Sequence, residues 1–185
     1  MDAFKGTICH SSQHKGAEGW AGKRAVVVGC CNSYATSLFV CRALLVETDS
    51  CPVRSGHDIA QAFHAVGAET TIVQRSSTYV MSSEHGIPGL LNGYYEEKIP
   101  VLDGDTLFTS LPMSMVEEYH IEATKQIAEK DKDTLDGLEK AGFKLNKYPG
   151  GLFIKYFRDG GGYYIDIGCS KVCPVSRWRK GASTD

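Results

Sequence analysis

Glycines and small polar residues that follow a β-branched run are the first sign of chemistry in this chain. Gly29 follows the run 26–28 (VVV), and Asn32 and Ser33 come shortly after it. A loop that binds a dinucleotide needs glycine for a tight turn, for close approach of the backbone to the diphosphate, and for close packing of the next helix. Gly29 fills the first position, but Tyr34 stands where the last glycine is expected.

Removing residues 34–55 would restore this pattern. Gly56 would then take the place of Tyr34, and an apolar helical pattern over residues 57–66 would follow at once. The same change brings the distance between Gly29 and Arg75 close to the roughly 20 residues that separate such a loop from the ribose-binding position. We therefore interpret Gly29 and Gly56 as two parts of one nucleotide-binding loop, separated by an insertion.

The residues after the next strand indicate which nucleotide would bind. Arg75 and Ser76 follow the run Glu69–Gln74, at the position where NAD-specific sites usually carry an acidic residue. A guanidinium and hydroxyl groups suit a 2′-phosphate, which predicts NADPH rather than NADH. The alternative is a surface arginine beside a polar turn. The predicted cofactor-binding residues are Gly29, Asn32, Ser33, Gly56, Arg75 and Ser76.

The elements that must position these residues form a strand, helix and strand in order. Arg24–Val28 is a short β-branched run, as in a buried parallel strand. Residues 57–66 have helical spacing, and Gly67 is placed to end that helix. Glu69–Gln74 reads as the second strand. This βαβ order predicts an α/β fold with a Rossmann-like nucleotide-binding domain.

The remaining chain gives weaker signals. Histidines 64 and 120 fall on helical patterns, and we expect both at helix surfaces. The expected organisation is a loop over residues 1–22, irregular chain over 76–110, one or two helices over 115–141, strands over 152–157 and 163–167, and a loose tail over 172–185. The nucleotide-binding domain would then span residues 23–171, interrupted by an insertion at 34–54.

The restored chain resembles the flavin-containing monooxygenases, in particular their YUCCA-like (indole-pyruvate monooxygenase-like) branch. Phe4, Gly6 and His10 are similar to the FxGxxxH fingerprint of that family, with His14 at a position that is usually aromatic. The split segment GCCNS…GHDIAQ is similar to its second glycine loop, with Cys31 at the middle glycine. QRSSTYV and YYIDIGCS resemble segments further downstream.

This resemblance implies an FAD-dependent monooxygenase. NADPH would reduce FAD, and a C4a-hydroperoxyflavin would oxygenate a small organic substrate, while the protein positions and shields the cofactor. The family carries an FAD-binding glycine loop ahead of the fingerprint, which here begins at Phe4. We therefore expect this chain to be the NADPH-binding portion and inactive alone. The alternatives are a stand-alone nucleotide-binding module and a non-functional product of incomplete splicing.

The splicing hypothesis concerns residues 34–54. Ser33 and Ser55 bracket the segment, and an intron running from the third base of the Ser33 codon to the second base of the Ser55 codon would be removed in frame and leave a single serine. Genomic sequence lacking GT and AG dinucleotides at these two serines would reject an unspliced intron. The competing interpretation is a genuine insertion, in which the run LFVCRALLV forms a short helix or strand at the edge of the domain.

Composition limits the class of protein. The chain is 42% hydrophobic and 23% charged, with a formal net charge of −2, which gives no electrostatic reason to expect nucleic acid or an anionic membrane as a partner. No apolar run approaches the roughly 20 residues of a membrane span. Seven cysteines without a secretion signal favour a reducing, cytoplasmic setting. Cys30 and Cys31 are interpreted as packing residues, and no metal site is expected.

Overall fold

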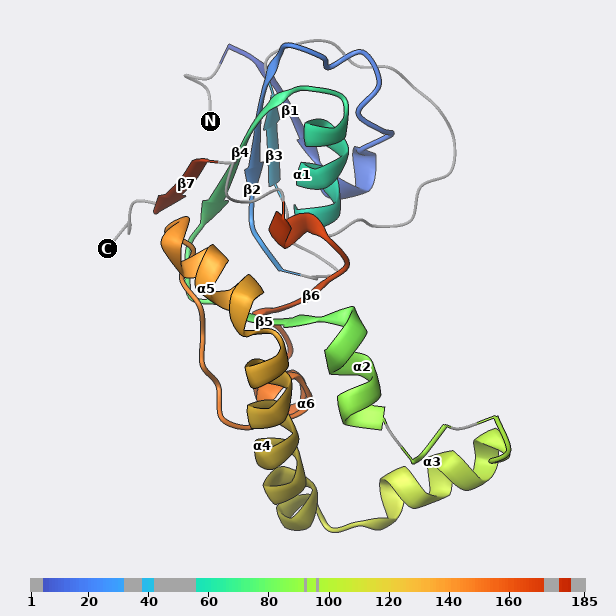
Figure 1. Ribbon diagram of the computed structural model, residues 1–185. Helices are drawn as coiled ribbons and strands as arrows, with labels where there is room; N and C mark the ends of the chain where they lie inside the picture. The colour runs from blue at the N-terminus through green and yellow to red at the C-terminus, as the bar shows by residue number, and fades with distance from the viewer. Residues whose placement is uncertain are drawn as a thin grey trace.

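The computed structural model describes residues 5–31, 38–41, 56–91, 93–95, 97–171 and 177–180. Phe4, Asn32 and Ser33, and most of the segment 34–54, lie outside the described residues. Figure 1 shows a sheet with one helix against it, and a group of helices beyond the end of that sheet. The chain is an α/β protein.

The larger sheet has the order β1-β3-β2-β4-β7. Strands β2, β4 and β7 are parallel to one another, whereas β3 is antiparallel to both of its neighbours, β1 and β2. The bounds of its strands are Thr7–His10 (β1), Arg24–Val28 (β2), Leu38–Cys41 (β3), Glu69–Gln74 (β4) and Arg177–Lys180 (β7).

Helix α1 (Gly56–Ala65) follows β3 and precedes β4, so the predicted order of strand, helix and strand is confirmed with β3 inserted between β2 and α1. It ends as expected at Gly67, which has a φ of 79°. The Gly67 amide donates to the His64 carbonyl at 2.9 Å and the Ala68 amide to the Phe63 carbonyl at 3.0 Å, the bonds of a left-handed helix cap. The core beneath α1 contains Ile59, Phe63, Val27 and Ile72, all fully buried.

Beyond the end of this sheet, β5 (Tyr79–Ser82) pairs in parallel with β6 (Tyr163–Asp166). Four helices pack around this second, two-stranded sheet, and α3 (Val101–Ser110) extends away from them (Figure 1). Those four helices are α2 (Ser83–Leu91), α4 (Met113–Lys130), α5 (Lys132–Lys140) and α6 (Gly151–Asp159). The prediction of one or two helices over residues 115–141 is confirmed by α4 and α5, and that of a strand over 163–167 by β6.

The prediction of irregular chain over residues 76–110 is wrong, because β5, α2 and α3 lie there. Glycines suggested breaks, but two of them in α2 allow close packing instead. A Cβ atom at Gly89 would lie 2.8 Å from Cγ1 of Ile127 on α4, and one at Gly86 would lie 2.6 Å from Sδ of Met81. Glycine is needed here for the approach of neighbours and not for a turn.

The prediction of a strand over residues 152–157 is also wrong, because this segment forms α6. A short apolar run fits a strand or a buried helix equally well by pattern alone. The helix is favoured by an ion pair one turn apart, with 2.8 Å between Lys155 Nζ and Asp159 Oδ2. It ends at Gly160, whose φ of 65° is left-handed.

Three further segments differ from expectation. Residues 1–22 were predicted as loop, but β1 and a short 3-10 helix, η1 (Ser11–Gln13), lie within them. Within residues 34–54, where a helix or strand was expected at the edge of the domain, β3 is a strand that lies between β1 and β2 inside the sheet. In the predicted loose tail, the described residues form β7 beside β4.

None of the helices that the structure describes is long and apolar enough to cross a membrane.

Candidate functional site

The carboxyl ends of β2 and β4 meet at one edge of the sheet. Val28 pairs with Val73 in the parallel register, and the Gly29 amide donates to the Val73 carbonyl at 3.0 Å. Gly29 then turns the chain with a φ of 111°, a conformation that side chains disfavour. Arg75 and Ser76 follow β4 at the same edge, and both are exposed. Two parts of the predicted site are thus neighbours.

The first turn of α1 lies at this edge as well. The Gly22 amide bonds the Gly67 carbonyl at 3.0 Å and the Glu69 amide bonds the Lys23 carbonyl at 2.8 Å, so the helix ends at the opposite edge, where β2 and β4 begin. A helix of this length spans roughly 15 Å, about the length of β2. Gly56, at the start of α1, is therefore at the edge that carries Gly29 (Figure 1).

His57 fastens the first turn of α1 to the rest of the molecule. Its ring is fully buried and stacks on the ring of Tyr164 in β6, with centroids 3.3 Å apart and planes at 6°. Burial lowers the pKa of His57 to about 3, against the opposing effects of the Asp166 carboxylate and a hydrogen bond with the Cys30 backbone. His57 is therefore a neutral packing residue that lies beside the glycine turn.

Asp166 orders the chain that leaves β6. Its Oδ1 accepts hydrogen bonds from the Tyr164 hydroxyl, from the Gly168 amide at 2.9 Å and from the Ser170 amide at 3.0 Å. Burial would raise the pKa of Asp166, but these hydrogen bonds outweigh it and the pKa is lowered. A buried carboxylate thus holds the segment that packs against α1.

A series of hydrogen bonds connects the backbone at Lys144 with the turn that follows β2. Gln74 is held by the backbone of Lys144, whose amide donates to Gln74 Oε1 at 2.8 Å and whose carbonyl accepts from Nε2 at 2.9 Å. Gln74 Nε2 also donates to Thr78 Oγ1 at 3.3 Å. The Thr78 oxygen lies 3.1 Å from Cys30 Sγ and 3.7 Å from Cys31 Sγ. No periodic pattern in the sequence indicated this cluster.

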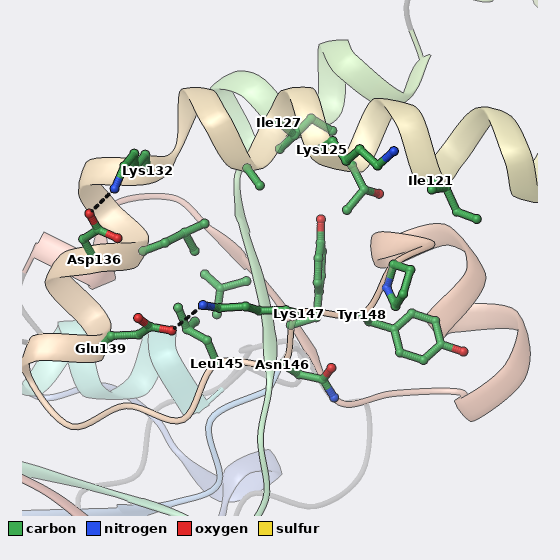
Figure 2. Close-up of a pocket in the computed structure, with 16 residues that line it drawn as sticks. Ile121, Lys125, Ile127, Lys132, Asp136, Glu139, Leu145, Asn146, Lys147 and Tyr148 are labelled. Atoms are coloured by element: carbon green, nitrogen blue, oxygen red, sulfur yellow. Dashed lines mark hydrogen bonds and ion pairs between the residues drawn. The ribbon is translucent and has the colours of Figure 1, made fainter.

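A separate cavity of 360 Å³ lies between the helices α4 and α5 and the segment 145–149. Ile121 and Ile127 of α4 and Leu145 and Tyr148 of the facing segment line it, and Figure 2 shows these residues. Tyr79 and Val80 of β5 also line the cavity, and its exposed surface is mainly apolar. The volume lies in the range of pockets that bind small organic molecules.

The charged side chains around this cavity are paired with one another. Lys132 Nζ lies 2.6 Å from Asp136 Oδ2 and Lys147 Nζ lies 3.1 Å from Glu139 Oε1, as the dashed lines in Figure 2 mark. Lys125 pairs with Glu122 at 3.3 Å. Inside, Tyr79 is buried, and desolvation raises the pKa of its hydroxyl to about 12. The cavity therefore offers a neutral hydroxyl and no unbalanced charge.

Two histidines in the helical part have roles that the sequence did not indicate. His120 was expected at a helix surface but is buried at 1% exposure, stacked on Phe153 with ring centroids 4.2 Å apart, and burial lowers its pKa to about 4. The expectation was wrong because Phe153 is distant in sequence. His85 Nδ1 lies 2.6 Å from Asp131 Oδ1, and Asp131 also accepts from the Ser82 amide and hydroxyl. This cluster ties α2 to the junction of α4 and α5.

No protein-family model and no curated protein matches the chain. Within the described residues, no group of three or more His, Cys, Asp or Glu side chains could hold a metal ion. The structure brings four of the six predicted site residues to one edge of the sheet: Gly29, Gly56, Arg75 and Ser76. Asn32 and Ser33 stay predictions, because they lie outside the described residues.

Proposed function

We propose that this edge of the sheet binds NADPH, as part of a Rossmann-like domain. The observation that carries the proposal is the meeting of three features. A left-handed glycine follows β2, the first turn of α1 lies beside it, and an exposed arginine follows β4. Helix N-termini favour phosphate, and a guanidinium favours the 2′-phosphate. The sequence resemblance extends this proposal to the NADPH-binding portion of an FAD-dependent monooxygenase.

Each residue has a distinct part in this proposal. Gly29 and Gly56 let the diphosphate approach the backbone, and Arg75 with Ser76 holds the 2′-phosphate. NADPH would supply a hydride to the flavin when both are bound. Cys31 does not fit fully, because its side chain stands where the family has a glycine and a thiolate there would oppose the diphosphate.

The test is a titration of the purified chain with NADPH and with NADH. We expect NADPH to bind more tightly, and Arg75→Gln to weaken NADPH binding about ten-fold while leaving NADH binding unchanged, since a hydrogen bond to a charged group contributes about 1.5–3 kcal/mol. Lys15→Gln, at an exposed site on another segment, is the control for lost charge. Equal binding of both nucleotides, insensitive to Arg75→Gln, would contradict the proposal.

The same preparation separates the alternatives. If the chain folds and binds NADPH but does not retain FAD, it is either the NADPH-binding portion of a monooxygenase or a stand-alone module. These two are then distinguished by whether the chain supports oxygenation when a flavin-binding partner is added. A folded chain that binds no nucleotide points to a non-functional product of incomplete splicing. Flavin retention together with NADPH consumption would contradict the expectation that the chain is inactive alone.

A second candidate function is binding of a neutral, largely apolar small molecule in the cavity beneath α4 and α5. Its walls are apolar, its lysines are neutralised by carboxylates, and the Tyr79 hydroxyl supplies one polar contact. We expect 2-naphthol to bind and naphthalene-2-sulfonate to bind at least ten-fold more weakly, because nothing offsets its charge.

Variants of the cavity test this by fluorescence titration of the ligand. Ala128→Trp, which fills the cavity from α4, should abolish naphthol binding, and Glu129→Trp on the same helix should leave it intact. Tyr79→Phe should weaken binding a few-fold, the effect of one lost hydrogen bond. If the two tryptophan variants bind alike, the cavity is not the binding site.

A further inference from the structure

The two adjacent cysteines after β2 point toward the same oxygen atom. In an extended strand, consecutive side chains face opposite sides. Here the chain turns at Gly29, and both sulfurs lie near Thr78 Oγ1, Cys30 at 3.1 Å and Cys31 at 3.7 Å. Both thiols thus lie within hydrogen-bonding reach of one hydroxyl, and the Cys30 side chain also hydrogen-bonds the Cys31 side chain.

The surroundings make the two sulfurs unequal. Cys30 is buried at 4% exposure, whereas Cys31 is half-buried and reachable from solvent. A hydrogen bond from Cys30 lowers the pKa of Cys31; burial opposes this, and the Thr78 hydroxyl and the Lys155 ammonium lower it further. The pKa of Cys30 is raised by the same hydrogen bond and by burial. Negative charge therefore gathers on the exposed sulfur.

Thr78 is oriented to support that charge. Its oxygen accepts a hydrogen bond from Gln74 Nε2 at 3.3 Å, and Gln74 is itself fixed by two bonds to the Lys144 backbone. The hydroxyl proton of Thr78 is thereby left to point at a sulfur. Lys155, whose side chain is only 8% exposed and is paired with Asp159, lowers the pKa of Cys31 through its charge. Hydrogen bonds and nearby cations of this kind favour the thiolate, which is the reactive form of cysteine.

We propose that Cys30 and Cys31 form a reactive dithiol, in which Cys31 attacks small hydroperoxides and Cys30 closes a disulfide with it. The Cys31 thiolate attacks one oxygen of the hydroperoxide, the O–O bond breaks, and the departing oxygen takes up a proton as alcohol or water. Cys31 is then a sulfenic acid. The Cys30 sulfur attacks the Cys31 sulfur, loses its proton and releases water. The two thiols are oxidised by two electrons and the hydroperoxide is reduced by two.

The chain contains its own control. Cys9 is also half-buried, but burial raises its pKa. With hydrogen peroxide at pH 7, and without any nucleotide, site-resolved mass spectrometry should find Cys31 oxidised at least ten times faster than Cys9, with loss of two hydrogens from the Cys30–Cys31 pair. In Cys30→Ser, the reaction should stop at a sulfenic acid on Cys31 that dimedone traps. Equal rates at Cys9 and Cys31 would overturn the proposal.

A second variant tests the role of the hydrogen-bond chain. Thr78→Val removes the shared hydroxyl and should slow oxidation of Cys31 about ten-fold, the effect of one hydrogen bond to a charged group. Thr70→Val changes another buried threonine, which bonds only the Ala68 carbonyl among the described contacts, and should leave the rate unchanged. An unchanged rate in a folded Thr78→Val variant would sink the proposed activation. Since no nucleotide is present, these outcomes do not depend on NADPH binding.

Discussion

Gly151 and Gly160, near the two ends of α6, have nearly the same positive φ angle in different surroundings. Their φ values are 60° and 65°. A Cβ atom at Gly151 would lie 2.1 Å from Thr124 Oγ1, whereas one at Gly160 would meet nothing within 4 Å. Gly151 is therefore required by space as well as by conformation, and Gly160 by conformation alone.

This contrast predicts different costs for the same substitution. Gly160→Ala should lower the free energy of unfolding by about 1–2 kcal/mol, the cost of a left-handed residue with a side chain. Gly151→Ala should cost at least ~2 kcal/mol more, because Thr124 on α4 must move. Urea unfolding of both variants measures the difference.

Thr124→Ala gives the check on that explanation. It removes the oxygen that the new methyl group would meet, so the double variant with Gly151→Ala should recover part of the loss. Equal losses in the Gly151 and Gly160 variants would show that α4 does not constrain the start of α6.

Among the elements, α1 and α6 show when the local sequence pattern is sufficient to predict a helix. In α1, the buried side chains Ile59 and Phe63 recur at helical spacing, and Gly67 ends the helix. Both features can be read from neighbouring residues, and the helix was predicted within one residue at each end. In α6, aromatic and aliphatic side chains follow one another and mask the period. Packing against α4 decides the conformation there.

The arrangement of these elements also explains where the candidate site lies. Strand β2, helix α1 and strand β4 bring Gly29, Gly56 and Arg75 to one edge because parallel strands end together and the connecting helix returns beside them. This arrangement follows from the order of elements and was predictable. The convergence of Cys30 and Cys31 on Thr78 was not, because Thr78 lies beyond the end of β4 and is held there by residue 144.

For the whole molecule, buried neutral histidines predict loss of stability in acid. Burial lowers the pKa of His57 from 6.5 to about 3 and that of His120 from 6.5 to about 4. At pH values between these and 6.5, the unfolded chain binds protons that the folded chain does not. The contribution of the two histidines to the free energy of unfolding is therefore fully present above pH 6.5 and is lost as the pH decreases. The lowered pKa of Asp166 acts in the same direction at lower pH.

We expect the free energy of unfolding to fall by ~2 kcal/mol between pH 7 and pH 5 from His57 alone, at about 1.4 kcal/mol per pKa unit. His57→Phe keeps an aromatic ring against Tyr164 and should remove about half of the pH dependence that His57 and His120 cause together, as measured by urea unfolding at both pH values. His64→Gln on the same helix is the matched control. A pH dependence that is the same in both variants would contradict the contribution of His57.

Strands β2 and β4, helix α1 between them in space, helices α4 and α5, strand β6 and the candidate nucleotide-binding residues could be predicted from the sequence, because period, turn residues and spacing are properties of neighbouring positions. Contacts in the folded molecule were needed to establish that Gly86, Gly89 and Gly151 serve close packing, that His57 and His120 are buried and neutral, and that β3 lies inside the sheet. These outcomes depend on contacts between segments far apart in the chain. A local pattern cannot encode them, because the same short apolar or glycine-containing segment is stable in different conformations against different neighbours.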